Sequence, residues 1–116
     1  DKFQYVHAGH VGQTQVEQNQ IGHLALELRD RRYEEALEVA EQIKHHYPSS
    51  VYGFDIASVA YRGLGETEKS LQEGKSALEM DRNAKRVESY ARSLAAAGKL
   101  DQAVSLLEGW LAENPQ

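Results

Sequence analysis

Five histidines are the side chains of this chain best suited to bind a metal ion, and their spacing is poor for it. His7 and His10 lie close together in a glycine-containing stretch, His45 and His46 are adjacent, and His23 is alone. A zinc site needs three or four ligands that converge on a fixed scaffold, and the chain has no cysteine to contribute one. We therefore expect no metal site and no cofactor.

Residue patterns that carry enzymatic chemistry are also missing. The sequence has no Gly-x-Ser-x-Gly elbow, no Gly-x-x-x-x-Gly-Lys phosphate loop and no His-Glu-x-x-His pair. Gly63-Leu64-Gly65 is typical of a turn, because a nucleotide loop would follow a strand and carry a trailing lysine. The many carboxylates are expected on outward helix faces, with nothing to bury or pair them. We predict that this segment has no catalytic residue and is not an enzyme.

Composition narrows the range of partners. The 116 residues include 18 acidic and 13 basic side chains, for a formal charge of −5. A nucleic-acid groove or an anionic membrane surface would favour a net basic face, so neither is the expected main partner. No run approaches the ~18 apolar residues that a membrane span needs, so we expect a soluble segment without membrane insertion.

The elements that must position any functional residue repeat along the sequence with a period of about 34 residues. This period lies within the range of helical-hairpin arrays. Gly65 and Gly98 are one period apart, and Pro48, Arg82 and Pro115 close three successive copies. A period in this range is typical of stacked supersecondary units that cannot bury their apolar faces alone. The chain also begins without methionine and ends at a repeat boundary, so we expect it to be a piece of a longer protein.

Apolar spacing predicts an all-α solenoid of three stacked antiparallel helical hairpins, over residues 14–48, 49–82 and 83–116. Residues 1–13 lack a helical period and are predicted to be a partly ordered arm, followed by a capping box at Thr14 to Glu17. Asp30-Arg31-Arg32 is expected to break the first hairpin, whereas glycines mark the turns of the other two. Each helix face repeats at i, i+3, i+4 and i+7, as in Ile21, Leu24, Ala25 and Leu28.

Over residues 17–115 the chain resembles the tetratricopeptide-repeat family. The second copy matches the family pattern at Phe54, Ser58, Tyr61, Gly65 and Ala77, and the third at Ala91, Leu94, Gly98, Ala103 and Pro115. The first copy matches at Ala25, Tyr33, Ala36 and Pro48, but its turn is one residue short, which leaves the register of its first helix open. The resemblance implies a right-handed superhelix whose concave face, lined by the first helix of each hairpin, binds a partner peptide or helix.

The resemblance also implies which residues line that concave groove. The second copy contributes Tyr52, Asp55, Val59 and Arg62, the third Lys85, Glu88 and Arg92, and the first Asn19, Leu26 and Arg29. The lysine–asparagine clamp with which one subgroup binds chaperone tails is not matched, because those positions hold Asp55 and Glu88. Arg62 and Arg92 rank highest as contacts, since guanidinium groups suit carboxylates and lie near the aromatic Tyr52. The competing interpretation is that these charges form an ordinary solvated helix face.

Trp110 departs from the family pattern, which places a small residue there against the next repeat. With Leu107 and Leu111 it would form an open apolar end patch, and such patches mark interfaces. The alternative is that Trp110 folds back on Leu94 and Val104 and covers the core.

The predicted function is a non-catalytic protein-interaction scaffold in a larger bacterial multi-repeat protein. A weaker resemblance of residues 94–115 to bacterial envelope lipoproteins linked to exopolysaccharide export and protein sorting favours the envelope over the cytoplasm. Two alternatives remain: a structural unit that self-associates through its C-terminal end, and an accessory or regulatory domain of a larger enzyme.

Overall fold

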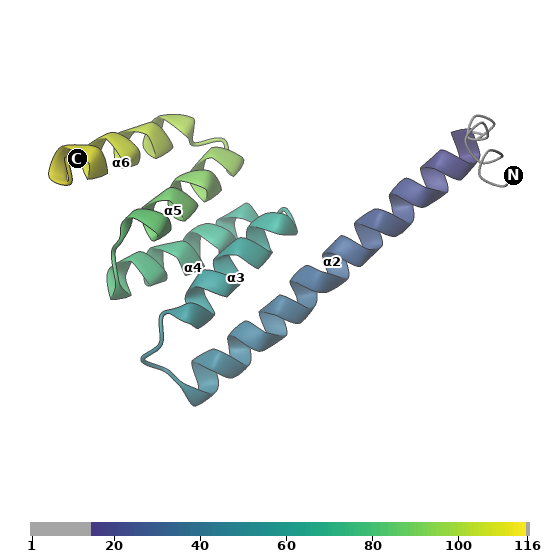
Figure 1. Cartoon of the computed structure of the whole chain (residues 1–116), viewed down its shortest axis with the longest axis horizontal. Helices are drawn as coiled ribbons and strands as arrows, with labels where there is room; N and C mark the ends of the chain where they lie inside the picture. Colours follow the sequence, from purple (N-terminus) through teal and green to yellow (C-terminus); the bar gives the residue numbers. More distant parts are fainter. Residues whose placement is uncertain (1–14, 116) are drawn as a thin grey trace, which may run out of the picture. The chain divides into compact units, whose positions relative to one another are not determined.

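The computed structural model describes residues 15–115 of the chain, and within them it is entirely helical (Figure 1). The helices are α2 (Gln15–His46), α3 (Tyr52–Gly63), α4 (Thr67–Met80), α5 (Ala84–Ala96) and α6 (Leu100–Glu113). This confirms the predicted all-α class. The predicted arm 1–13, with His7 and His10, and the capping threonine Thr14 lie outside the described residues.

The chain divides into two compact units, residues 1–31 and residues 32–116. In the described part of the first unit, α2 carries an exposed His23–Glu27 pair with 3.0 Å between Nε2 and Oε2. Leu26 and Leu28 are also largely exposed there. Every side chain described between positions 23 and 31 is exposed, so none of these described side chains contributes to a core.

The predicted break at Asp30-Arg31-Arg32 is wrong, because α2 runs through these residues as continuous helix. None of the three is glycine or proline, and each costs at most about 0.7 kcal/mol in helix propensity relative to alanine. A polar triplet interrupts the apolar pattern without interrupting the backbone hydrogen bonds. The first copy is therefore not the helix–turn–helix that its sequence pattern predicts.

The second unit contains the two hairpins that the sequence predicts after residue 48. Helix α3 packs on α4, α5 packs on α6, and the two hairpins meet through α4 with α5 and α3 with α5. Gly65 and Gly98 have φ values of 82° and 80°, and they are the described residues with positive φ. The backbone N–H of Glu66 then bonds to the carbonyl of Tyr61, and that of Lys99 to the carbonyl of Leu94. Both turns are thus glycine-terminated helix ends.

Small residues allow the helices of the second unit to approach closely. A Cβ placed on Gly53 of α3 would lie 2.8 Å from Cγ of Lys44 and 3.0 Å from the carbonyl oxygen of Ala40, both on α2. A Cβ on Gly63 would overlap the ring of Tyr33. Around the second hairpin contact, Leu71, Ala91, Leu94 and Ala103 form a buried cluster. Alanine and glycine contribute little buried area each, so the fold depends on close contact between helices rather than on large side chains.

A serine ladder, formed by Ser58, Ser70 and Ser93, lies where α3, α4 and α5 meet. The Ser58 hydroxyl donates to the carbonyl of Ser70 (3.0 Å), and the Ser70 hydroxyl donates to the carbonyl of Ser58 (2.7 Å). The Oγ atoms of Ser70 and Ser93 are 2.7 Å apart. Because the Ser70 proton is already used, Ser93 must donate to Ser70. The described residues contain no buried side-chain N or O atom without a hydrogen-bond partner.

Two glycine-to-alanine substitutions should change stability in opposite directions. Gly98→Ala should lower the free energy of unfolding by about 1–2 kcal/mol, because alanine is strained at positive φ. Gly109→Ala, inside α6, should raise it by about 0.5–1 kcal/mol through helix propensity. Neither added Cβ would meet another atom within 4 Å, so changes in packing do not contribute to the difference in stability between the two variants. Urea denaturation measures both, and a shift of the same sign in the two variants would contradict the backbone assignment.

Candidate partner-binding groove

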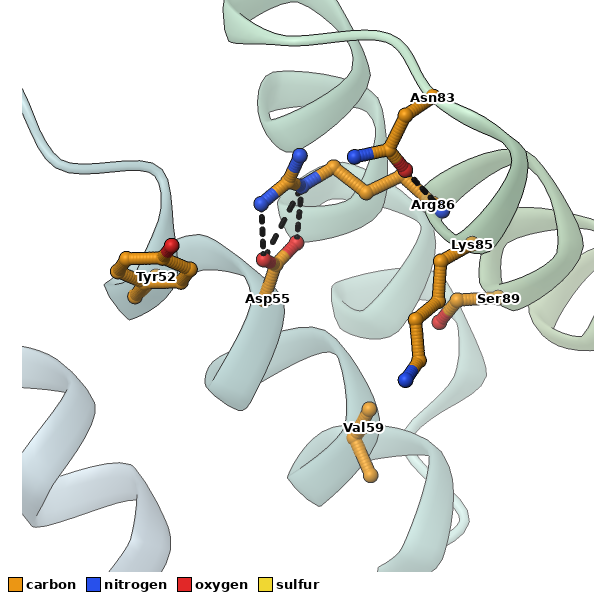
Figure 2. Close-up of a pocket in the computed structure, with 7 residues that line it drawn as sticks. All are labelled: Tyr52, Asp55, Val59, Asn83, Lys85, Arg86 and Ser89. Atoms are coloured by element: carbon orange, nitrogen blue, oxygen red, sulfur yellow. Dashed lines mark hydrogen bonds and ion pairs between the residues drawn. The ribbon is translucent and has the colours of Figure 1, made fainter.

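Four of the predicted groove residues come together in a pocket between the first helices of the two hairpins. This α3–α5 pocket has a volume of about 270 Å³ and is lined by Tyr52, Asp55, Val59, Asn83, Lys85, Arg86 and Ser89 (Figure 2). Tyr52, Asp55 and Val59 recur along α3 at the i, i+3, i+7 spacing, which places them on one helix face. Lys85 lies in the first turn of α5.

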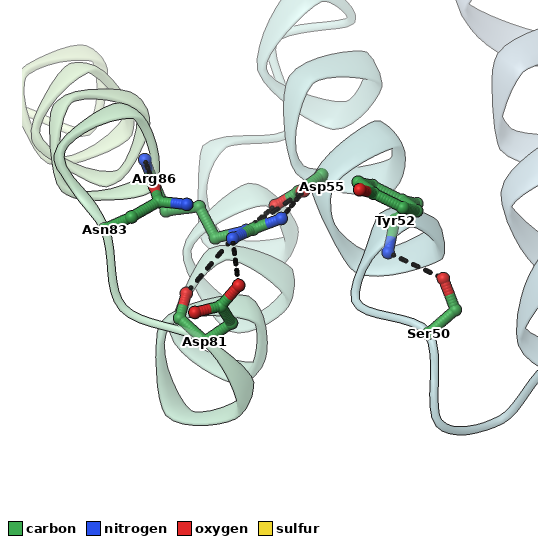
Figure 3. A network of polar contacts seen from close by, with 6 residues as sticks. All are labelled: Ser50, Tyr52, Asp55, Asp81, Asn83 and Arg86. Carbon is green, nitrogen blue, oxygen red and sulfur yellow. Dashed lines mark hydrogen bonds and ion pairs between the residues drawn. The ribbon is translucent and has the colours of Figure 1, made fainter.

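Arg86 and Asp55 form one wall of the α3–α5 pocket. Nε of Arg86 donates to both oxygens of Asp55 at 2.9 and 3.0 Å, and Nη2 donates to Oδ2 at 2.8 Å. Nη1 donates to a carboxylate oxygen of Asp81 at 3.0 Å (Figure 3). The Arg86 side chain is only 11% exposed, and its hydrogen bonds to Asp55 raise the pKa of its guanidinium. This bidentate pair fixes α5 against α3.

Sequence reasoning missed Asn83 and Arg86 in this pocket. The Oδ1 atom of Asn83 accepts from the backbone N–H of Arg86 at 2.9 Å, so Asn83 is the N-cap of α5. An asparagine before a helical pattern is a recognisable sequence signal for a cap. Nothing in the sequence identifies Arg86, because its role depends on Asp55, which lies far away in the sequence on another helix.

The side chains of Tyr52, Val59 and Lys85 in this pocket are exposed to solvent. Tyr52 is 64% exposed and Val59 44% exposed, which is high for apolar side chains on a packed helix. Lys85 is exposed, and among residues 32–115 no carboxylate lies within ion-pair distance of it. Arg86, by contrast, is neutralised by Asp55 and Asp81. Lys85 is therefore the pocket cation that remains available to an anionic ligand.

A second pocket adjoins the first along α3. This α2–α3 pocket has a volume of about 430 Å³ and is lined mainly by the apolar groups of Tyr33, Ala36, Ile56, Val59 and Ala60, with Arg32 and Asp55 also present. Asp55 and Val59 line both pockets, so the two are neighbours along α3. Together they form what we call the α3 groove, apolar at one end and polar at the other.

The two arginines ranked highest from the sequence have other contacts. Nη1 of Arg62 donates to the carbonyl of Ser89 (2.9 Å) and to Oγ of Ser93 (3.0 Å), so this side chain joins α3 to α5 at the end of the serine ladder. Burial, and then the nearby charge of Arg92, lower the pKa of Arg62. Arg92 pairs on the surface with Glu88, one turn earlier, at 2.9 Å. Arg62, Glu88 and Arg92 do not line the α3 groove.

The residues predicted from the first copy belong to the other compact unit. Leu26 and Arg29 are exposed on α2, and the side chain of Asn19 lies outside the described part of the chain. Their place in a binding groove stays a prediction.

The predicted C-terminal end patch is partly exposed. Leu107 and Leu111 are exposed on α6, whereas Trp110 is half-buried with the Arg82 guanidinium 5.5 Å from its ring centroid. Trp110 is thus covered from one side by a cation–π contact, and its two leucine neighbours are not.

Residues 15–115 contain no group of three or more histidine, aspartate or glutamate side chains placed to hold a metal ion. No helix among them has the length and hydropathy needed to cross a membrane. Comparison of the chain with protein-family models, curated proteins and solved structures gave no match.

The contacts of Arg62 predict that it acts on stability. Arg62→Met should lower the free energy of unfolding by about 1–3 kcal/mol, because charged hydrogen bonds to Ser89 and Ser93 are lost from a half-buried site. Arg92→Met, the matched control, should change it by less than about 0.5 kcal/mol, since the Arg92–Glu88 pair is exposed. Chemical denaturation of the two variants measures both values; equal effects would refute the assigned role of Arg62.

Proposed function

We propose that this chain is a non-catalytic scaffold that binds a segment of a partner protein in the α3 groove. The observation that carries this proposal is a pair of neighbouring pockets that share Asp55 and Val59. Exposed Tyr52 and Lys85 line one of the two. Exposed aromatic and aliphatic side chains around a concave, partly apolar surface are typical of protein-interaction sites.

The proposed architecture is a tetratricopeptide-like solenoid with a right-handed superhelix. Its support is the repetition of the hairpin from residues 52–80 in residues 84–113, with the turn glycines Gly65 and Gly98 one period apart. Further support comes from the contact between α3 and α5, the first helices of the two hairpins. In such a stack the first helices lie side by side and form a continuous binding surface.

Rigidity of the groove favours binding. The Asp55–Arg86 pair and the Arg62 contacts both connect α3 to α5, and they lie toward opposite ends of α3. A surface held in this way loses little conformational entropy when a ligand binds. The roles of Arg62 and Arg86 are therefore to position the helices, whereas Tyr52, Val59 and Lys85 are the proposed ligand contacts.

The chemistry of the groove favours a ligand that combines an apolar side chain with a carboxylate. The α2–α3 pocket is lined mainly by apolar groups, and Lys85 in the adjoining α3–α5 pocket is a cation without an acidic partner among the described residues. An aliphatic or aromatic side chain would be buried at the first site, and an aspartate or glutamate nearby would pair with Lys85 at the second.

Selection of random linear peptides on the immobilised chain tests the proposal. We expect selected peptides to contain an apolar and an acidic residue, and to shift backbone amide NMR signals of α3 and of the first turn of α5. Tyr52→Ala and Lys85→Glu should each weaken binding by about tenfold or more in fluorescence anisotropy titrations, because each removes an exposed groove contact.

Lys75→Glu is the matched control. Lys75 is an exposed lysine on α4 that lines neither pocket, and the substitution makes the same change of net charge as Lys85→Glu. It should change affinity by about twofold at most. Absence of any binding peptide, or peptides whose affinity Tyr52→Ala and Lys85→Glu leave unchanged, would count against the α3 groove as the binding site.

A further inference from the structure

Helix α6 carries an aliphatic seam along one exposed face. Leu100, Val104, Leu107 and Leu111 recur at alternating i+4 and i+3 steps, which aligns them on a single stripe. Their exposed fractions lie between 37% and 61%. A stripe with this spacing is the pattern of a helix face that packs against another helix, and within residues 32–115 nothing covers it.

The same face of α4 is covered. The positions one period before those of the seam are Thr67, Leu71, Gly74 and Leu78. Leu71 belongs to the buried cluster with Ala91 and Leu94 of α5. A Cβ on Gly74 would come within 2.9 Å of the Tyr90 ring, also on α5. This face of α4 is therefore the surface that receives the first helix of the following hairpin.

The equivalent face of α2 in the second unit is used in the same way. The positions one further period back are Tyr33, Leu37, Ala40 and Lys44. Tyr33, Ala40 and Lys44 all approach glycines of α3 closely. The equivalent faces of α2 and α4 thus each pack against a helix that follows in the sequence. The seam on α6 is the third such face, and no helix within residues 32–115 lies on it.

A charge at the edge of the seam narrows the chemistry of a helix that could dock on it. At the covered contact, Glu68 in the first turn of α4 lies 3.8 Å from Lys99, which follows α5. Asp101 occupies the position of Glu68 in the next copy, and among the described residues of its own unit, 32–115, no cation lies within ion-pair distance of it. An exposed pair of this kind contributes little affinity, but it selects the sign of the partner's charge.

We propose that the α6 seam docks a partner helix of the same chemistry as α5. That helix has small, aliphatic or aromatic residues at i, i+3, i+4 and i+7, as α5 has Val87, Tyr90, Ala91 and Leu94. It also has a lysine or arginine just after its last turn that meets Asp101. The α6 seam of a second copy does not fit. In an antiparallel pair of α6 helices, Asp101 and Glu108 at the edge of one seam would face the same carboxylates of the other.

A peptide with the sequence of residues 83–99 is the probe, added to the intact chain. Trp110 lies on α6 between Leu107 and Leu111, is the chain's only tryptophan, and is absent from the probe. We expect a saturable change in Trp110 fluorescence as the peptide binds. Leu107→Glu and Leu111→Glu should each weaken binding about tenfold or more, because a carboxylate replaces a leucine in the contact.

Charge reversal tests the polar edge separately. A peptide with Lys99→Glu should bind the wild-type chain more weakly, and Asp101→Lys in the chain should restore its binding, because attraction replaces repulsion. Ser105→Glu, exposed on α6 but away from the seam, should leave binding unchanged. Circular dichroism melting curves establish that each variant is folded.

Two results would overturn this proposal. One is the absence of any saturable fluorescence change at peptide concentrations up to about 1 mM, the range of very weak complexes. The other is a dimer of the chain in analytical ultracentrifugation that Leu107→Glu dissociates, because a second copy would then cover the seam. Neither result bears on the α3 groove, which lies on other helices.

Discussion

The close contact of α3, α4 and α5 at the serine ladder is the constraint on which the second unit depends. These helices approach closely enough that only small side chains fit between them, and three of those side chains are hydroxyls. Buried hydroxyls destabilise a core unless each proton has an acceptor. Here every hydroxyl has an acceptor: Arg62 donates to Ser93, Ser93 donates to Ser70, and Ser70 and Ser58 each donate to the backbone carbonyl of the other. The ladder therefore fixes both the spacing and the register of the three helices.

The proposed binding surface follows from that constraint. Arg62 ends the serine ladder near the C-terminus of α3, and the Asp55–Arg86 pair connects α3 to α5 closer to its N-terminus. These two contacts fix α3 against α5. The side chains of α3 that take part in neither contact can therefore bind a ligand. The charged residues of α3 and of the first turn of α5 thus have two roles: Arg62, Asp55 and Arg86 hold helices together, while Lys85 makes no such contact with the described residues of its own unit.

The all-α class, the two C-terminal hairpins and their turns could be predicted from the sequence, because they depend on local signals. Gly65 and Gly98 take the positive φ that other residues avoid, and apolar periodicity marks the helices. The break expected at Asp30-Arg31-Arg32 was wrong because a change in polarity was interpreted as a change in backbone conformation. Tyr52, Asp55, Val59 and Lys85 are groove positions that the family resemblance implies, and in the structure all four line one pocket. Arg86 was missed because its contacts are tertiary, and Asn83 because its capping signal was not used.

By itself, the sequence determined the helical class, the period and the glycine turns, since each depends on a pattern that can be read along the chain. It also determined that apolar positions recur on α6, although it could not say which of them are covered. Only the tertiary structure decided which charges hold helices and which stay available, because an ion pair such as Asp55–Arg86 joins residues on different helices. It likewise decided that, within the described residues, the seam of α6 is open while the matching faces of α2 and α4 are filled. Burial and pairing depend on neighbours across space, which no local pattern specifies.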